Sequence, residues 1–191
     1  MILKNLQKVK MKYSKVNFVA LLVLFPIILF SQNNTEVKLE TVDSVNLEKY
    51  VGTWYEISKI PNSFQDQCIK NTTANYKINN DGEIIVLNKC IDEDGEIDEA
   101  EGLARIVDKT SNAKLEVSFV SIFGWHLFWG DYWIIGLEKD YQYVCVGTPS
   151  KKYGWILSRT SKMNSENLEK CYNIFEKNGY DRNKFELSLQ D

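Results

Sequence analysis

Apolar and polar residues alternate with a period of two along much of the chain after residue 50. The alternation is clear where Ala74, Tyr76 and Ile78 are separated by the polar residues Asn75 and Lys77. Because successive side chains of a strand point to opposite faces, this pattern predicts strands with one buried face. We predict eight strands, over residues 53–60, 72–78, 83–91, 99–107, 114–120, 131–137, 142–147 and 153–160.

Short turns join these strands. Residues 79–82 read Asn-Asn-Asp-Gly, a strong hairpin signal because Asn, Asp and Gly tolerate positive φ, and Asp94-Gly95 ends the third strand. Consecutive strands with short links predict an all-β fold, an eight-stranded up-and-down antiparallel β-barrel. Closure removes the exposed sheet edges, and a barrel of this size has room inside for side chains or one small ligand.

The hydrophobic period changes near the C-terminus. Apolar residues recur there at helical spacing, at Leu168, Cys171, Tyr172 and Phe175. Asn164 or Ser165 suits the start of a helix and Gly179 its end. We predict one amphipathic α-helix of about fourteen residues packed outside the barrel, with a short last strand over residues 185–189.

The first 31 residues have the order of a secretory signal peptide. Five lysines precede an apolar run over residues 18–30, interrupted by Pro26 and followed by Ser31. The run of about thirteen residues is shorter than the ~20 that a spanning helix needs. A retained N-terminal anchor is the alternative, since Leu29 makes the cleavage site imperfect. The prediction is a signal peptide over residues 1–31 and one domain over residues 32–191.

The cysteine that carries a lipid in exported lipoproteins does not follow this apolar run. We therefore predict export to the periplasm, to the outer membrane surface or to the medium, without a lipoprotein anchor. The signal segment holds five lysines and no acidic residue, so the formal charge of −3 becomes about −8 for the rest. Such an acidic domain is a poor nucleic-acid binder and is repelled by anionic lipid headgroups.

Four cysteines lie in the exported part, where disulfides are favoured, and they allow three pairings. Cys68 precedes the first strand of a predicted hairpin and Cys90 ends the second, so the two residues are expected at the same end of that hairpin. Cys171 lies on the apolar face of the predicted helix, and Cys145 is the wall residue that it would face. We favour Cys68–Cys90 and Cys145–Cys171; the alternative is that one pair remains as buried thiols. With no CxxC spacing and one histidine, no zinc site is predicted.

A glycine and a tryptophan open the first strand, and an arginine ends the last one. We predict that Gly52, Trp54 and Arg159 close one end of the barrel. The guanidinium of Arg159 would lie over the indole of Trp54, an arrangement that contributes about 1–2 kcal/mol when it is shielded from water. Both residues are therefore interpreted as structural.

Three segments resemble the three lipocalin motifs in order and spacing: Gly52-Thr53-Trp54-Tyr55-Glu56, Gly130-Asp131-Tyr132-Trp133 and Leu157-Ser158-Arg159-Thr160. Residues 73–76, 86–88, 113–119 and 155–160 look like the bacterial lipocalin and apolipoprotein D branch, and the likeness covers residues 43–190. The resemblance implies a barrel that binds a small hydrophobic molecule, typically a fatty acid or a lysophospholipid. It also implies lipid storage, transport or repair at the envelope.

Strand positions give one set of candidate ligand-binding residues. Tyr55, Tyr76, Phe119 and Tyr143 are expected to face the interior, although a slip of one residue would invert the set. Alternation also puts one of the neighbours Tyr132 and Trp133 inside, and Trp133 is the candidate.

The segment 121–130 joins the fifth and sixth predicted strands and contains a second set of candidate ligand-binding residues. Its large apolar side chains are unusual for a loop, because exposed apolar patches mark ligand or membrane contacts. We predict that Phe123, Trp125, Phe128 and Trp129 gate the interior or dip transiently into lipid. The alternative is that they fold inward and plug the opening. His126 has no nucleophile or carboxylate nearby in sequence, so no catalytic role is assigned to it.

An acidic run surrounds the turn after the third strand, at Asp92, Glu93, Asp94, Glu96, Asp98, Glu99 and Glu101. Gly95 is out of place for a calcium loop, so a solvated hairpin is predicted. The remaining possibility is that the run disfavours anionic ligands at the opening.

The sequence as a whole predicts a ligand carrier without enzymatic activity, cofactor or metal, present as a monomer or weak dimer. Two rival classes stay open. A ligand-modifying enzyme would need a reactive thiol inside the barrel, for which Cys145 is the candidate. A protein-binding lipocalin would be favoured by a filled interior.

Overall fold

The computed structural model describes residues 37–191. The predicted signal peptide, residues 1–31, lies outside the described residues. No helix within residues 37–191 is both long and apolar enough to span a membrane.

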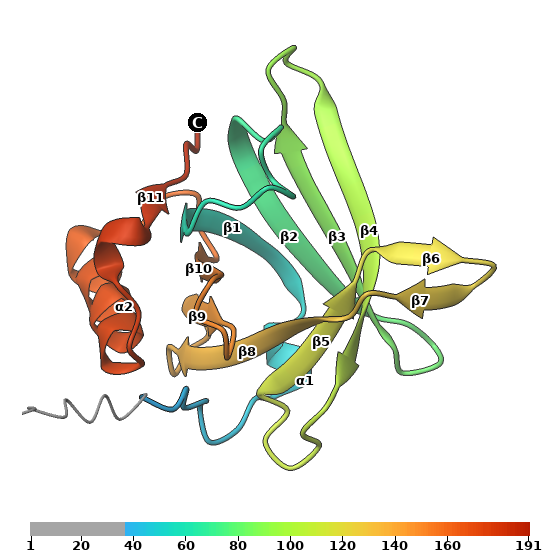
Figure 1. Cartoon of the computed structure of the whole chain (residues 1–191), viewed down its shortest axis with the longest axis horizontal. Coiled ribbons are helices and arrows are strands. Elements are labelled where there is room, and N and C mark those ends of the chain that lie inside the picture. The colour runs from blue at the N-terminus through green and yellow to red at the C-terminus, as the bar shows by residue number, and fades with distance from the viewer. Residues whose placement is uncertain (1–36) are drawn as a thin grey trace, which may run out of the picture. The chain divides into compact units, whose positions relative to one another are not determined.

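Eight antiparallel strands form a closed barrel, and the predicted fold class is confirmed (Figure 1). Each strand pairs with the next, and pairing between the first and the last, with Tyr55 opposite Ser158, closes the ring. The strands are β1 (Gly52–Lys59), β2 (Lys70–Ile78), β3 (Ile84–Ile91), β4 (Ile97–Ile106), β5 (Lys114–Ser118), β8 (Gly130–Leu137), β9 (Tyr143–Gly147) and β10 (Gly154–Ser158).

One end of the barrel is closed by the short helix α1 (Leu47–Tyr50) and by the predicted arginine–tryptophan stack. Trp54 is fully buried, and its indole N–H donates to the Tyr50 carbonyl at 2.9 Å. The guanidinium carbon of Arg159 lies 3.7 Å from the centre of the Trp54 ring. The opposite end, which we call the mouth, is formed by the connections 60–69, 92–96, 119–129 and 148–153.

The helix α2 (Ser165–Lys177) packs outside the barrel against β8 and β9, as predicted (Figure 1). The Asn164 side chain caps its first turn by accepting from the backbone N–H of Asn167. Cys171 and Phe175 are on the buried face of α2. They belong to an outer apolar cluster that is separate from the one inside the barrel. The β8 and β9 strands therefore have apolar residues on both faces.

The chain after α2 returns to the edge of β1. A 3-10 turn, η1 (Arg182–Lys184), leads into β11 (Glu186–Leu187), which pairs with β1 beside Ser58. The predicted last strand over 185–189 is thus shorter than expected. Beyond it, the Gln190 side-chain amide donates to the Glu56 and Thr72 carbonyls at 2.8 and 2.9 Å, tying the terminus to β1 and β2.

The segment 121–130 is not an irregular loop, as the sequence suggested, but contains a two-stranded hairpin. Its strands β6 (Val120–Ile122) and β7 (Trp125–Leu127) project from the barrel as a separate ribbon (Figure 1). Phe123 and Gly124 form the turn, both with positive φ. That turn geometry suits a two-residue hairpin but is unusual for a bulky residue such as phenylalanine.

Candidate ligand-binding site

A cavity of about 630 Å³ opens at the mouth and extends into the barrel. Small and aliphatic side chains from the strands, such as Ala74, Val86 and Leu157, form part of its wall. Aromatic side chains supply much of the rest, namely Phe64, Tyr76, Phe119, Phe128, Trp129, Tyr132, Tyr153 and Trp155. A concave, largely apolar wall with a few polar groups is typical of sites for small hydrophobic molecules.

Strand register explains why one side of the cavity is wide. Asn88 in β3 lies opposite Ala74 in β2 and Ala100 in β4, and all three line the cavity. Two alanines in this row leave space that larger side chains would fill. Gly102 has a related role, because a Cβ there would lie 2.6 Å from the Ser118 carbonyl oxygen and 2.7 Å from the Phe119 ring. Only glycine therefore lets Phe119 pack this closely against β4.

A polar network joins the mouth to the chain terminus. The Gln65 amide oxygen accepts from the Trp155 indole at 3.0 Å, and its nitrogen donates to the Glu56 carboxylate at 2.9 Å. Glu56 also accepts from the Ser188 hydroxyl at 2.6 Å and lies 3.5 Å from the Lys59 ammonium. These partners satisfy a carboxylate that is only 2% exposed. The sequence pattern did not indicate this network, because Trp155 and Ser188 lie 90 and 132 residues from their partners Gln65 and Glu56.

The predicted disulfide between Cys68 and Cys90 is present, with 5.5 Å between the Cα atoms. It lines the cavity and joins the connection before β2 to the end of β3. Asp98 lies beside it and accepts from the Gln67 amide at 2.7 Å. Within residues 37–191 these two sulfurs and the Asp98 carboxylate are the one grouping of potential metal ligands, and both sulfurs are held in the disulfide.

Of the strand candidates, Tyr76 and Phe119 line the cavity, whereas Tyr55, Trp133 and Tyr143 do not. These three were placed on the wrong face: they pack in the outer cluster associated with α2. The inward neighbour of Trp133 is Tyr132, and the Trp133 ring lies 4.7 Å from the Lys114 ammonium. The outer face of the barrel is apolar here, so hydrophobicity did not distinguish inside from outside.

The aromatic residues of segment 121–130 divide into two groups. Phe128 and Trp129 line the cavity, and the Arg105 guanidinium lies 4.1 Å from the centre of a Trp129 ring. Phe123 and Trp125 lie outside the cavity wall and are 99% and 76% exposed. These two therefore do not plug the opening. His126 packs against Trp129, with 6.0 Å between the ring centres.

The acidic run forms the predicted exposed turn between β3 and β4. The Asp92 carboxylate organises this turn by accepting from the backbone N–H groups of Asp94 and Glu96 at 3.0 and 2.8 Å. Asp98 is the member of the run that lines the cavity. An influence of the run on ligand charge stays a prediction.

The predicted disulfide between Cys145 and Cys171 is wrong. Both cysteines are free and fully buried, although they are neighbours as expected, with the Cys145 sulfur 4.0 Å from the Cys171 carbonyl oxygen. Burial raises the pKa of the Cys145 thiol well above its ordinary value. Cys145 also belongs to the outer cluster and not to the cavity wall. The enzyme hypothesis thus loses the reactive thiol that it required.

Thiol titration tests this assignment. The native protein is expected to show no rapidly reacting thiol, because both free sulfurs are buried beneath α2 and the raised pKa of Cys145 disfavours its thiolate. Unfolding in denaturant without reductant should release two reactive thiols, and Cys145→Ser should reduce that number to one. Release of none would show that the second disulfide forms after all.

Comparison with known proteins identifies the family. The sequence model described as "Lipocalin-like domain" matches residues 45–190. The chain belongs to the lipocalin family. Temperature-induced lipocalin-1 of Arabidopsis thaliana is 38% identical to this lipocalin over 160 residues, which cover 82% of the chain and 86% of the relative. Outer membrane lipoprotein Blc of Vibrio cholerae is 36% identical over 148 residues, covering 76% and 83%.

Solved structures agree on the fold of this lipocalin. Insecticyanin from the tobacco hornworm Manduca sexta superposes with a TM-score of 0.62 at 24% identity, over 78% of this chain and 83% of that chain. At this level of identity the likeness supports the fold alone. The resemblance to bacterial lipocalins and apolipoprotein D is confirmed by the sequence relatives.

Proposed function

We propose that this lipocalin binds one small hydrophobic molecule, of the fatty acid or lysophospholipid class, and stores or transports it without changing it chemically. The observation that supports this most directly is the open, aromatic-lined cavity of about 630 Å³. Burial of ~300 Å² of apolar ligand surface contributes about 7 kcal/mol before entropic costs, so hydrophobic burial is a substantial driving force for binding. A filled interior would have favoured the protein-binding alternative.

We propose that this lipocalin is exported and handles lipids at the cell envelope. The relative from Vibrio cholerae bears the name outer membrane lipoprotein, and the basic and apolar order of residues 1–31 is that of a signal peptide. The acidic character of the exported part argues against nucleic-acid partners.

We also propose transient membrane contact through the β6–β7 hairpin during ligand exchange. Ile122, Phe123, Trp125 and Phe128 are all at least half exposed, and Phe128 borders the cavity itself. The hairpin is a narrow ribbon that projects from the barrel, so a lipid surface can surround its tip on all sides, whereas a rigid protein partner would cover one face. The net negative charge favours a zwitterionic surface over an anionic one.

Filling the cavity tests the ligand-binding proposal. Ala100→Trp adds an indole to a cavity-lining position of β4, whereas Glu101→Trp adds it to the neighbouring exposed residue outside the cavity wall. Palmitic acid and lysophosphatidylcholine should bind the natural protein and Glu101→Trp with similar affinity. Ala100→Trp should weaken binding about tenfold or more, as measured by native mass spectrometry and by competition with a fluorescent apolar probe.

Equal binding by the two tryptophan variants would place the ligand outside the barrel. Absence of binding to the natural protein would contradict the proposed function itself.

A further inference from the structure

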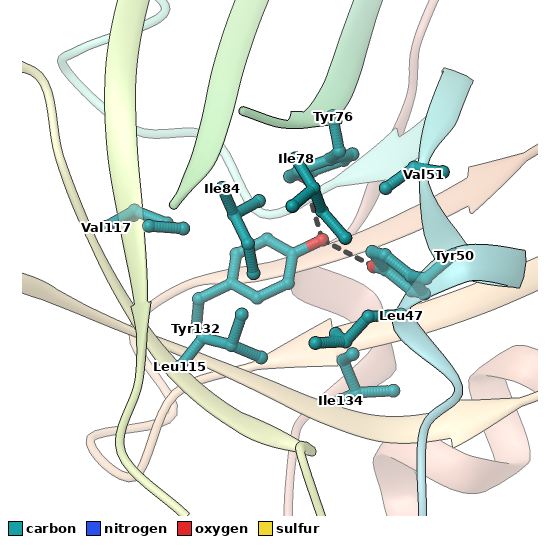
Figure 2. Close-up of a pocket in the computed structure, with 11 residues that line it drawn as sticks. Leu47, Tyr50, Val51, Tyr76, Ile78, Ile84, Leu115, Val117, Tyr132 and Ile134 are labelled. Atoms are coloured by element: carbon teal, nitrogen blue, oxygen red, sulfur yellow. Dashed lines mark hydrogen bonds between the residues drawn. The ribbon is translucent and has the colours of Figure 1, made fainter. Parts of the chain in front are cut away.

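Three tyrosine side chains meet inside the barrel (Figure 2). They lie at the closed end of the cavity. The Tyr132 hydroxyl lies 2.7 Å from that of Tyr50 and accepts from that of Tyr76 at 2.9 Å. The three side chains come from β8, from α1 and from β2, where Tyr76 pairs with Gly52 beside the barrel closure. All three are at most 9% exposed, and Tyr76 and Tyr132 also line the cavity. The cavity thus has a polar floor.

The hydroxyl hydrogens of this tyrosine triad outnumber its hydrogen bonds. Three hydroxyls offer three donors, and the described residues provide two hydrogen bonds among them and no further acceptor. Tyr76 donates to Tyr132, and in the second hydrogen bond either Tyr132 or Tyr50 can be the donor. The hydroxyl hydrogen left without an acceptor therefore belongs either to Tyr50 or to Tyr132. A buried donor without an acceptor is costly, and the two orientations differ only in which hydroxyl supplies it.

A void of about 10 Å³ beside the triad is a poor place for the missing acceptor. It is at the lower limit of the volume that one water needs, and apart from the three tyrosines its lining residues are apolar. The cavity side of Tyr132 is roomier, since this residue borders the space of about 630 Å³. An acceptor atom on a bound ligand can reach the donor from there.

We propose that the cavity selects ligands whose inner end bears a neutral oxygen acceptor, a hydroxyl or a carbonyl, which accepts a hydrogen bond from the tyrosine triad. This inference rests on the proposed function and adds the chemistry of the ligand's buried end. A ligand that reaches the floor with a bare methyl group leaves the extra donor unpaired, so it binds less well than its oxygenated counterpart.

The floor suits a neutral group better than a carboxylate. Burial raises the pKa of Tyr76 to about 12 and holds the pKa values of Tyr50 and Tyr132 well above their ordinary value, so the triad remains a set of neutral donors. The cavity lining includes one basic residue, Lys89, and it is paired with Glu99. A carboxylate at the floor would be buried without a free cation, which is unfavourable.

Matched fatty acids test the proposal. Acids of ten to sixteen carbons are compared with the same acids bearing a hydroxyl on the terminal carbon, so that both keep a carboxylate at the mouth. The natural protein is expected to bind the hydroxylated acids more tightly than the plain ones at the chain length that reaches the floor. The double variant Tyr76→Phe/Tyr132→Phe should lower the hydroxylated-to-plain affinity ratio about tenfold.

Two single variants separate ligand recognition from structural effects. Tyr50→Phe removes the competing acceptor but leaves Tyr76 and Tyr132, so it should preserve or increase the preference for the hydroxylated acid. Tyr143→Phe removes a hydroxyl outside the cavity and should leave the ratio unchanged. Equal or tighter binding of the plain acids at every chain length, or an unchanged ratio in the double variant, would overturn the inference while the proposed function stands. Failure of both acid series to bind would overturn both.

Discussion

Replacing Arg159 by alanine is expected to destabilise the fold by about 3–5 kcal/mol, which corresponds to a fall in Tm of roughly 10 °C. The Arg159 guanidinium covers the buried Trp54 indole and donates to five backbone carbonyls. Four of these are contributed by residues 49–51 and 53, and the fifth by Tyr141. One side chain therefore joins α1, the start of β1 and the β8–β9 connection.

Two further variants test whether the contacts of the Arg159 guanidinium cause the expected loss of stability. Arg159→Lys keeps the charge but loses the planar fork, so an intermediate loss is expected. Arg182→Ala removes another stacked arginine, 4.8 Å from the Tyr172 ring, but its ion pair with Glu169 is exposed and contributes at most about 1 kcal/mol. Equal unfolding free energies for Arg159→Ala and Arg182→Ala would contradict the closure role. Ligand affinity of the folded Arg159→Ala protein should be unchanged, since this residue does not line the cavity.

The barrel could be predicted from the sequence because its signals are local. Alternation around Tyr76 located β2, the turn over residues 79–82 fixed the following hairpin, and the helical spacing of Leu168 and Phe175 located α2. The stack of Arg159 on Trp54 was predictable for a different reason. In a closed antiparallel barrel the first and last strands are neighbours, so the start of the first lies beside the end of the last.

The facing of individual residues was less predictable. Tyr55, Trp133 and Tyr143 are aromatic like many residues that line the cavity, but they pack in the apolar cluster outside the barrel. Register shifts in the pairing of β1 with β10, between Glu56 and Ser58, and of β8 with β9 also interrupt strict alternation. Because a shift of one residue exchanges the two faces, a period of two cannot be extended through such a position.

The candidate site required contacts that no sequence spacing records. The tyrosine triad brings together α1, β2 and β8, and the mouth network joins Gln65 to Glu56 and Ser188. The cysteines show the same limit. Hairpin geometry correctly paired Cys68 with Cys90, and the facing of Cys145 and Cys171 was also right, but proximity did not determine the oxidation state of the second pair.

Removing the aromatic tip of the β6–β7 hairpin is expected to lower binding to zwitterionic vesicles about 30- to 100-fold. The change Phe123→Asn/Trp125→Ser removes the two most exposed large side chains of the tip that lie outside the cavity wall. Their transfer into lipid contributes roughly 1–1.4 kcal/mol each, which gives the expected factor. Vesicle co-sedimentation and the tryptophan emission shift measure it.

Protein stability should not fall in this variant, because Phe123 adopts φ 51°, a conformation that asparagine tolerates better than phenylalanine. Affinity for soluble fatty acid should also stay constant, so that loss of vesicle binding reports the surface contact alone. Val107→Ser is the matched control: this apolar residue is 56% exposed and follows β4 at the end remote from the mouth. If vesicle binding is unchanged in the hairpin variant, or falls equally in Val107→Ser, the hairpin is not the membrane contact. Because the chain is acidic, binding should also weaken as anionic lipid is added, and stronger binding to anionic vesicles would contradict the charge argument.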